Sequence, residues 1–558
     1  METAVGGERM KKRSLHAVSL GGIVAAPHYL AAETGRRVLE DGGNALEAMI
    51  AMAAVITVVY PHMNSIGGDN FWLFYDAKKK VVKGINGSGR SGKNASIDWY
   101  KERGWTAIPA RGYEAANTVP GAVSGWDMAY TYSKESMGGR RTWRELLEPA
   151  VQLADGGFPV SDSQAYWTKM NVQEGNDRNL QRFPGFSRTF LRGGRPYEAG
   201  ERFRQRELAD TLAYLQETGA AGFYTGKIAR QIAAEMAAGN GLLTEEDFSG
   251  HQARWEEPLY VPYRSGMAAN LPPNTQGMAS LEILNILNQW DLGRIPEGSA
   301  AYYQLMIEAA KEAFADRDQY LTDPDFADIP LKELLSPAHG KKQAEAIRRR
   351  TKWSDAGLLD PKGDTVWLGA VDEEGNAVSM IQSIYYDFGS GIVAGGTGIT
   401  LQNRGSFFSL DPGHINRLEP RKRTFHTLNP PMLFKDGKSW LVYGTMGGEG
   451  QPQTQAALVT RIIDYGFSPS RAIDASRWLY GRSWGEAVNS VRIEGRAAAE
   501  VFQELEGLGY PVQRCEDYTD VMGHAGAIYI DPDTGMRTAG ADPRSDGAAE
   551  AAAPCRKK

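Results

Sequence analysis

The sequence predicts an α+β fold built as one interlocked unit. Strand-like alternation of β-branched and aromatic residues occurs towards both ends of the 558-residue chain, whereas helical apolar spacing dominates residues 142–238 and 301–350. No low-complexity linker separates these segments, and no repeat with a period of 20–50 residues is visible. We therefore expect sheets that combine early and late strands, with helices between and around them.

The N-terminal part is predicted to form two helices followed by two strands. Apolar residues are spaced helically from Ala31 to Tyr60, with Gly42-Gly43 as a break, and Pro61 ends the second helix. Residues 71–75 alternate like a strand, and residues 81–85 provide a polar partner strand.

Later elements follow the same local rules. Thr142 and Thr244 each precede acidic residues and are predicted to cap helices. Strand patterns return after Thr365 and end at Ala525–Ile530, and the tail from Ala548 to Lys558 is expected to be disordered.

Composition limits the possible functions. A hydrophobic content of 42% with 23% charged residues is that of a globular protein with a large core. The net charge of −6 and the scattered Lys and Arg give no reason to expect a nucleic-acid partner. Cys515 and Cys555 are too few for a disulfide framework, and eight histidines without ligand spacing predict no metal.

Two motifs carry the chemistry. Thr365 stands at the head of a predicted strand, and Gly444–Gly450 is a glycine-rich turn between a strand and a helix. Together they resemble the γ-glutamyltransferase family of N-terminal-nucleophile hydrolases. Further fragments match that family in order: Asp41–Ala45, Gly67-Gly68, Val119–Gly125, Pro149-Ala150 with Asp155–Phe158, Leu271–Pro273, Ala315–Arg317 with Asp323–Phe326, and Ala541–Arg544.

The resemblance covers roughly residues 21–547 and implies a four-layer αββα sandwich. It also implies that the precursor cuts itself between Asp364 and Thr365. The products would be a large fragment, 1–364, and a small fragment, 365–558, intertwined as a heterodimer without a cofactor. Gly21 to His28 resembles the family's first strand, although Lys11-Lys12-Arg13 before an apolar run imitates a secretory signal. We therefore expect a cytoplasmic protein, with the periplasm as the alternative; residues 48–60 are too short to span a membrane.

The implied catalytic residues suit amide hydrolysis. A threonine hydroxyl needs a base, and the α-amino group freed at Thr365, with a reference pKa near 8, can take its proton. The N–H groups around Gly447 and Gly448 match the family's oxyanion hole, and Ser383 matches a second hydroxyl beside the nucleophile. Sequence alone leaves Ser383 open as a strand serine facing water. It also leaves the glycines open as a plain tight turn, although the Lys-Ser/Thr of a phosphate-binding P-loop is missing.

The substrate-binding positions depart from the family pattern. Phe407 replaces an acid that holds a substrate ammonium, Arg404 replaces a glutamine, and Tyr385 replaces an asparagine. His426-Thr427 replaces a serine pair; sequence alone also allows His426 to be a core histidine. The family's arginine position falls at Ser88, with Arg90 two residues on. Arg90 and Arg404 are therefore candidates for a carboxylate clamp, and a surface arginine is the alternative for each.

These departures predict a substrate whose acyl group carries a carboxylate and needs no α-amine, such as a glutaryl amide. The stretch 410–422 is short where many relatives carry a lid, which favours hydrolysis and a bulky leaving amine. The chain thus resembles the cephalosporin acylase branch, which releases 7-aminocephalosporanic acid from its glutaryl derivative, with some γ-glutamyl activity. The alternatives are an oxamate-type amidohydrolase and, from another class, a non-catalytic binding protein with the same fold; a nucleotide-binding enzyme is a distant third.

Overall fold

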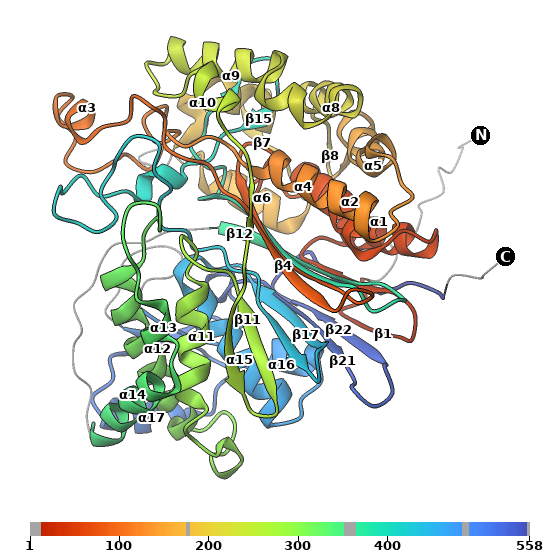
Figure 1. Cartoon of the computed structure of the whole chain (residues 1–558). Helices are drawn as coiled ribbons and strands as arrows, with labels where there is room; N and C mark the ends of the chain where they lie inside the picture. Colours follow the sequence, from red (N-terminus) through yellow and green to blue (C-terminus); the bar gives the residue numbers. More distant parts are fainter. Residues whose placement is uncertain (1–12, 174–178, 351–363, 482–489, 555–558) are drawn as a thin grey trace, which may run out of the picture.

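The computed structural model describes residues 13–173, 179–350, 364–481 and 490–554 and consists of four layers (Figure 1). Two seven-stranded antiparallel sheets stack face to face, and helices cover the outer face of each. The predicted αββα sandwich is thereby confirmed. Cys555, Lys11 and Lys12 lie outside the described ranges.

The first sheet has the strand order β23-β2-β12-β13-β3-β4-β9. Its strands are β23 (Ala548–Ala551), β2 (Ile23–Ala26), β12 (Asp364–Val371), β13 (Ala377–Tyr385), β3 (Asp69–Asp76), β4 (Val81–Gly87) and β9 (Arg254–Glu256). Strands from both ends of the chain are thus direct neighbours, as predicted. The expectation of a disordered tail was wrong for residues 548–551, because β23 pairs with β2 and its first two alanines are buried.

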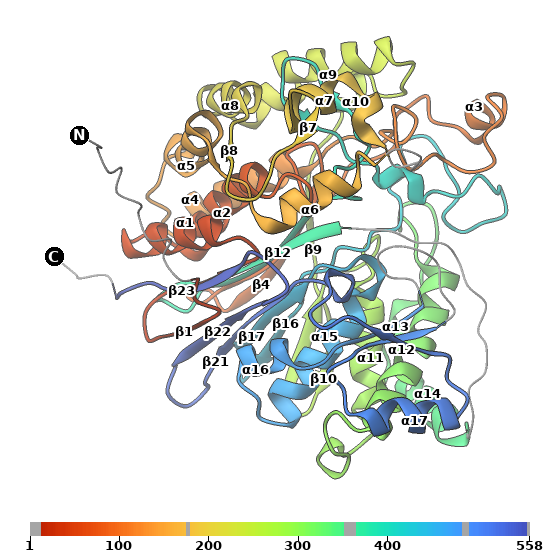
Figure 2. The same ribbon diagram turned by 180° about the vertical axis from the view of Figure 1, so that it is seen from behind.

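The second sheet has the order β1-β22-β21-β17-β16-β11-β10. Its strands are β1 (His16–Ser19), β22 (Arg537–Ala541), β21 (Ala525–Ile530), β17 (Lys438–Thr445), β16 (Met432–Lys435), β11 (Gly266–Asn270) and β10 (Leu259–Tyr263). Seen from behind, β1 lies at the edge beside β22, although more than 500 residues separate them (Figure 2).

Helices form the two outer layers (Figure 1). The first sheet is covered by α1 (Tyr29–Glu40), α2 (Ala45–Val59) and α4 (Ala122–Ser136), and α5 (Trp143–Gly156) and α8 (Arg206–Tyr224) pack on the outside of these helices. The second is covered by α11 (Gly277–Leu287), α15 (Gln451–Val459) and α16 (Pro469–Asp474), and α12 (Ala300–Tyr320) packs on the outside of α11 and α15. The remaining helices are α3 (Ile97–Lys101), α6 (Asp162–Met170), α7 (Pro184–Phe190), α9 (Lys227–Ala238), α10 (Glu245–Ser249), α13 (Leu331–Leu334), α14 (Pro337–Arg349) and α17 (Ala499–Gly507). Short strands complete the chain: β5 (Phe158–Pro159), β6 (Leu191–Arg192), β7 (Arg195–Pro196), β8 (Arg202–Phe203), β14 (Val393–Ala394), β15 (Ile399–Thr400), β18 (Trp478–Tyr480), β19 (Val491–Glu494) and β20 (Val512–Cys515).

Helix α2 shows how local sequence fixes the layers. Asn44 caps it, since its Oδ1 accepts the Glu47 N–H at 3.0 Å and Glu47 Oε2 accepts the Asn44 N–H at 3.0 Å. Every residue of α2 is buried between β12 and β13 on one side and α5 on the other. None of the described helices combines the length and hydropathy needed to cross a membrane.

The interface between the sheets is centred on Trp367 of β12. Its indole Nε1 donates to Ser379 Oγ at 2.9 Å, and the ring packs against Gly444 of β17 and Gly526 of β21. A Cβ at Gly444 would lie 2.2 Å from the indole, so only glycine fits there. This close contact ties the strand that begins at Asp364 to the strand that leads into the glycine-rich turn.

Candidate active site

Thr365 lies inside the first sheet, one residue after the start of β12. Asp364 pairs with Tyr385 and Val366 with Gln382, so Thr365 faces two residues of β13, Ser383 and Ile384, across a β-bulge. Its side chain is 1% exposed, and its Oγ1 has no hydrogen-bond partner within the described residues. A buried hydroxyl without a partner is costly and calls for an explanation, of which a catalytic role is one.

Ser383 is buried on β13 beside β12, which removes the alternative of a serine facing water. Its Oγ accepts the Tyr385 N–H at 2.8 Å, and its backbone pairs with Asp69 of β3. The bond to Tyr385 supports an unusual conformation, because Tyr385 has a φ of +80°. Non-glycine residues adopt this left-handed region only where the surroundings impose it, and such residues cluster at active sites.

The glycine-rich turn joins β17 to α15, as predicted. Gly447 and Gly448 have φ of +123° and +53°, and a short 3₁₀ turn at Gly448–Gly450 precedes the helix. The first N–H groups of such a turn have no acceptor within the helix and are therefore suited to receive an oxyanion. The geometry matches the predicted role, while the role itself stays a prediction.

Arg404 is a buried cation with unused donors. Its Nη1 donates to Thr427 Oγ1 at 3.1 Å, and its Cζ lies 4.1 Å from the ring centroid of Tyr385. Nε and Nη2 have no hydrogen-bond partner in the part of the chain that the structure describes. Burial lowers the pKa of Arg404 to about 10, although Tyr385, Asp69 and other nearby groups oppose this shift. The group is thus charged at neutral pH, with two nitrogen atoms available for an anion.

His426 is buried and neutral. Burial and the nearby Arg404 charge hold the pKa of His426 well below its usual range. Nδ1 accepts the Leu428 N–H at 3.3 Å, so the proton is on Nε2, which donates to Asp69 Oδ2 at 3.1 Å. His426 therefore supports Asp69 in the structure, as a core histidine would.

Asp69 is the main feature of this site that sequence reasoning missed. Its Oδ1 accepts the Gly89 and Gly121 N–H groups, each at 3.1 Å, and the Gln402 side chain at 3.0 Å. Burial raises the pKa of Asp69 to about 7, and these hydrogen bonds together with Arg404 oppose that rise. The Gly67-Gly68 turn before it was the only sequence signal, and it indicated a turn rather than a buried carboxylate.

The guanidinium of Arg90 is already paired. Its Nη1 is 3.2 Å from Asp323 Oδ2 and donates to the Arg421 carbonyl at 2.8 Å, while Nη2 pairs with Asp325. Of the two arginines considered for a carboxylate, Arg404 is the one with open donors beside Tyr385.

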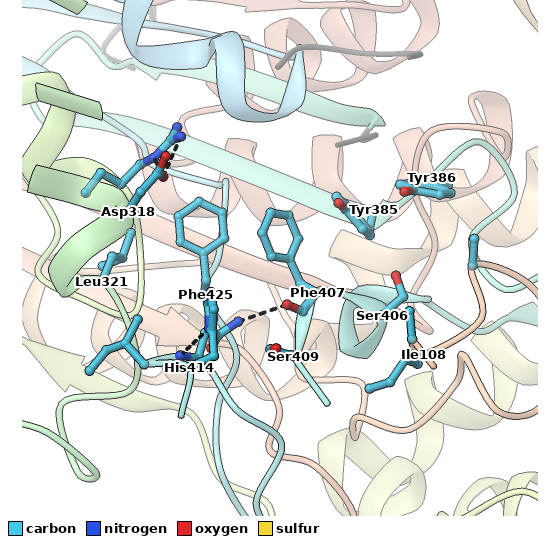
Figure 3. A pocket seen from close by; sticks show the side chains of 15 residues that line it. Ile108, Asp318, Leu321, Tyr385, Tyr386, Ser406, Phe407, Ser409, His414 and Phe425 are labelled. Carbon is cyan, nitrogen blue, oxygen red and sulfur yellow. Dashed lines mark hydrogen bonds and ion pairs between the residues drawn. The ribbon is translucent and has the colours of Figure 1, made fainter. Parts of the chain in front are cut away.

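A cavity of about 420 Å³ opens next to Tyr385 (Figure 3). Three aromatic rings lie side by side along its wall. The ring centroids of Tyr385 and Phe407 are 5.3 Å apart, and those of Phe407 and Phe425 are 4.5 Å apart. Arg317 and Asn416 add polar groups to its wall. Such a mixture of aromatic surface and a few polar groups is typical of a small-molecule site. Within the described residues, no group of three or more His, Cys, Asp or Glu side chains is placed to hold a metal ion.

Comparisons with known proteins show the family to which the chain belongs. A family model described as Gamma-glutamyltranspeptidase matches residues 31–552. The chain is 47% identical to the glutathione hydrolase-like YwrD proenzyme of Bacillus subtilis, covering 94% of this chain and 98% of the relative. It is 43% identical to the oxamate amidohydrolase proenzyme of Klebsiella pneumoniae, covering 95% and 98%. Among solved structures, cephalosporin acylase from Bacillus halodurans superposes with a TM-score of 0.88 at 34% identity, covering 99% of both chains. The chain therefore belongs to the gamma-glutamyltranspeptidase family and is an enzyme of the N-terminal-nucleophile hydrolase class.

Proposed function

We propose that this chain is a precursor that cuts itself between Asp364 and Thr365 and then uses Thr365 to hydrolyse amides of a carboxylate-bearing acyl group. The observation that carries the proposal is the pair of open groups at one site: the unpartnered Thr365 Oγ1 and the unpartnered Nε and Nη2 of Arg404, among the described residues. Tyr385 connects the two, since it pairs with Asp364 and stacks on Arg404.

Both reactions use the same hydroxyl. In the precursor, Thr365 Oγ1 attacks the Asp364 carbonyl, the C–N bond breaks, and water then hydrolyses the resulting ester to leave a free α-amine. In the mature enzyme that amine takes the hydroxyl proton while Oγ1 attacks the substrate carbonyl. The N–H groups at Gly447 and Gly448 stabilise the oxyanion. The amine of the substrate takes the proton from the Thr365 α-amino group and leaves. Water then hydrolyses the acyl-enzyme ester and releases the acid.

The acyl group we infer is glutaryl, with γ-glutamyl accepted more weakly. Arg404 offers a carboxylate two open donors, whereas Phe407 offers nothing to a substrate ammonium. The cavity of about 420 Å³ beside Phe407 has the size of a drug-like group, which supports a bulky amine such as a cephalosporin nucleus.

A second candidate is hydrolysis of oxamate. The 43% identity to the Klebsiella oxamate amidohydrolase proenzyme over nearly the full length of both chains supports it. The carboxylate of oxamate could also bind Arg404, but this substrate would fill little of the cavity.

Intact mass and N-terminal sequencing of the purified protein test the processing step. Hydrolysis assays with a glutaryl amide, a γ-glutamyl amide and oxamate test the substrate preference. We expect a fragment that begins Thr-Val-Trp-Leu and hydrolysis of the glutaryl amide above the other two. Thr365→Ala should remain one inactive chain of 61.1 kDa. A cut or active Thr365→Ala protein would remove Thr365 from this role, and activity on oxamate alone would favour the second candidate.

A further inference from the structure

Gln276, just before α11, connects the two halves of the site. Its Nε2 donates to the Thr427 carbonyl at 2.8 Å and to the Gly448 carbonyl at 2.9 Å. Its Oε1 accepts from Arg317 Nη1 at 3.3 Å, which fixes the orientation of the amide. The side chain is fully buried, so these bonds do not compete with water.

The same segment also holds its neighbours through the backbone. The Gln276 N–H donates to the His426 carbonyl at 2.9 Å, and the His426 N–H donates to the Asn274 carbonyl at 2.8 Å. Residues 274–276 thus form a rigid support under Thr427, whose Oγ1 accepts a hydrogen bond from Arg404.

On the other side, Arg317 stabilises the glycine-rich turn. Its Nη2 lies 3.0 Å from Glu449 Oε2, and both side chains are 2% exposed. The peptide after Gly448 is therefore held twice, by Gln276 at its carbonyl oxygen and by Arg317 through the next side chain.

The glycine-rich turn needs contacts such as those from Gln276 and Arg317 because glycine does not fix the backbone conformation by itself. Gly447 and Gly448 have no Cβ and sample more backbone conformations than any other residue type. An oxyanion hole stabilises a transition state only when its donors are already in place before the reaction. Contacts outside the turn must therefore select its conformation.

We propose, as a consequence that rests on the proposed function, that Gln276 is a positioning residue. It fixes the separation between the oxyanion donors at Gly447-Gly448 and the carboxylate site formed by Arg404 and Thr427. That separation sets the length of acyl chain that can place its carbonyl in the oxyanion hole while its carboxylate contacts Arg404. Gln276 thus determines acyl-length selectivity without contacting the reacting atoms.

The test is a substrate series: the mono-p-nitroanilides of oxalic, succinic, glutaric and adipic acids. It compares wild type with Gln276→Met, which keeps the side-chain length and removes the donors. We expect Gln276→Met to fold and to lose roughly tenfold or more in kcat on the best substrate. We also expect its preference for one chain length over its neighbours to flatten, because the separation is no longer fixed. Gln205→Met is the matched control, since Gln205 is also buried and donates to the Val58 carbonyl at 2.8 Å, away from the site.

A second variant covers the case in which Gln276→Met does not fold. Gln276→Glu keeps the shape and the acceptor for Arg317 but lacks the two N–H donors, and it should show the same flattened profile. An active wild type whose chain-length profile is unchanged in the folded variant would overturn this inference alone. A wild type that cleaves no member of the series would overturn the proposed function and this inference with it.

Discussion

The guanidinium of Arg404 lies over the ring of Tyr385, with Cζ 4.1 Å from the ring centroid. Tyr385 also lines the cavity, whereas Arg404 is 1% exposed and does not. The tyrosine ring therefore borders both the buried cation and the space that a substrate would enter. Tyr385 also pairs with Asp364 across the sheet, so the proposed cut would break the chain directly beside the strand partner of Tyr385.

Arg404→Leu should raise KM for a glutaryl amide by roughly tenfold to hundredfold, because a hydrogen bond to a charged group contributes about 1.5–3 kcal/mol. Arg90→Leu is the control. Its guanidinium is committed to Asp323 and Asp325, so KM should change by less than about threefold. Steady-state kinetics of the two processed variants decide between these arginines, and the reverse pattern would place the carboxylate at Arg90.

Phe407→Asp should shift the ratio of kcat/KM values towards γ-glutamyl over glutaryl amides. The new carboxylate, placed between Tyr385 and Phe425, would attract the substrate ammonium that Phe407 leaves without a partner. Phe407→Asn is the control, because asparagine has nearly the same shape as aspartate but no charge. It should leave the ratio close to that of the wild type. Equal ratios in both variants would mean that the α-amine does not lie near this position.

Gly447→Ala should lower kcat by roughly a hundredfold while the protein still folds. The nearest atom to an added Cβ is 3.6 Å away, so space is available, but a φ of +123° is strained for any residue with a side chain. The turn would relax and move its N–H groups. Gly437→Ala is the control, because Gly437 also has a positive φ, with open space around it, in the β16–β17 hairpin. Equal activity of the two variants would contradict an oxyanion role for the turn.

Acidification should weaken the fold through its buried histidines. Burial, reinforced by neighbouring charges, lowers the pKa of His28 to about 3 and that of His62 well below its usual value. Below about pH 6.5 the unfolded chain therefore binds protons that the folded chain does not, and stability falls as the pH drops towards 3. Each such group contributes about 1.4 kcal/mol per pH unit in that range.

Urea unfolding of the Thr365→Ala precursor at pH 7.5 and 5.5 measures this effect. His28→Asn should reduce the loss of unfolding free energy between the two pH values, whereas His16→Asn, at an exposed position, should not. Comparing variants removes the contributions of Asp69 and Asp372, whose pKa values burial raises to about 7 and about 6 and which act in the opposite direction. An unchanged loss in His28→Asn would show that this histidine does not titrate differently in the two states.

Local patterns predicted much of the fold. The last predicted strand, Ala525–Ile530, has the same bounds in the structure, and the break at Gly42-Gly43 separates α1 from α2. The strand–turn–helix around Gly447 was predicted because glycine spacing and apolar alternation are local signals.

The contacts that complete the site could not be predicted in this way. Gln276 meets Gly448 across 172 positions, and His426 meets Asp69 across 357. No periodicity encodes such pairs, because they exist only after the two sheets stack. Arg90 illustrates the same limit: its sequence neighbours suggested a role in binding the substrate, but its guanidinium is paired with Asp323 and Asp325.

The mixed order of strands in both sheets has a consequence for the lifetime of the mature enzyme. After a cut before Thr365, β2 would belong to one polypeptide and its neighbours β12 and β23 to the other. Neither polypeptide would contain all the strands of either sheet. Once heat separates the two polypeptides, neither could form a complete sheet on its own. We therefore expect the uncut precursor to refold more readily after heating than the mature enzyme. The lifetime of the mature enzyme at its working temperature would then depend on the rate of unfolding and not on the free energy of unfolding.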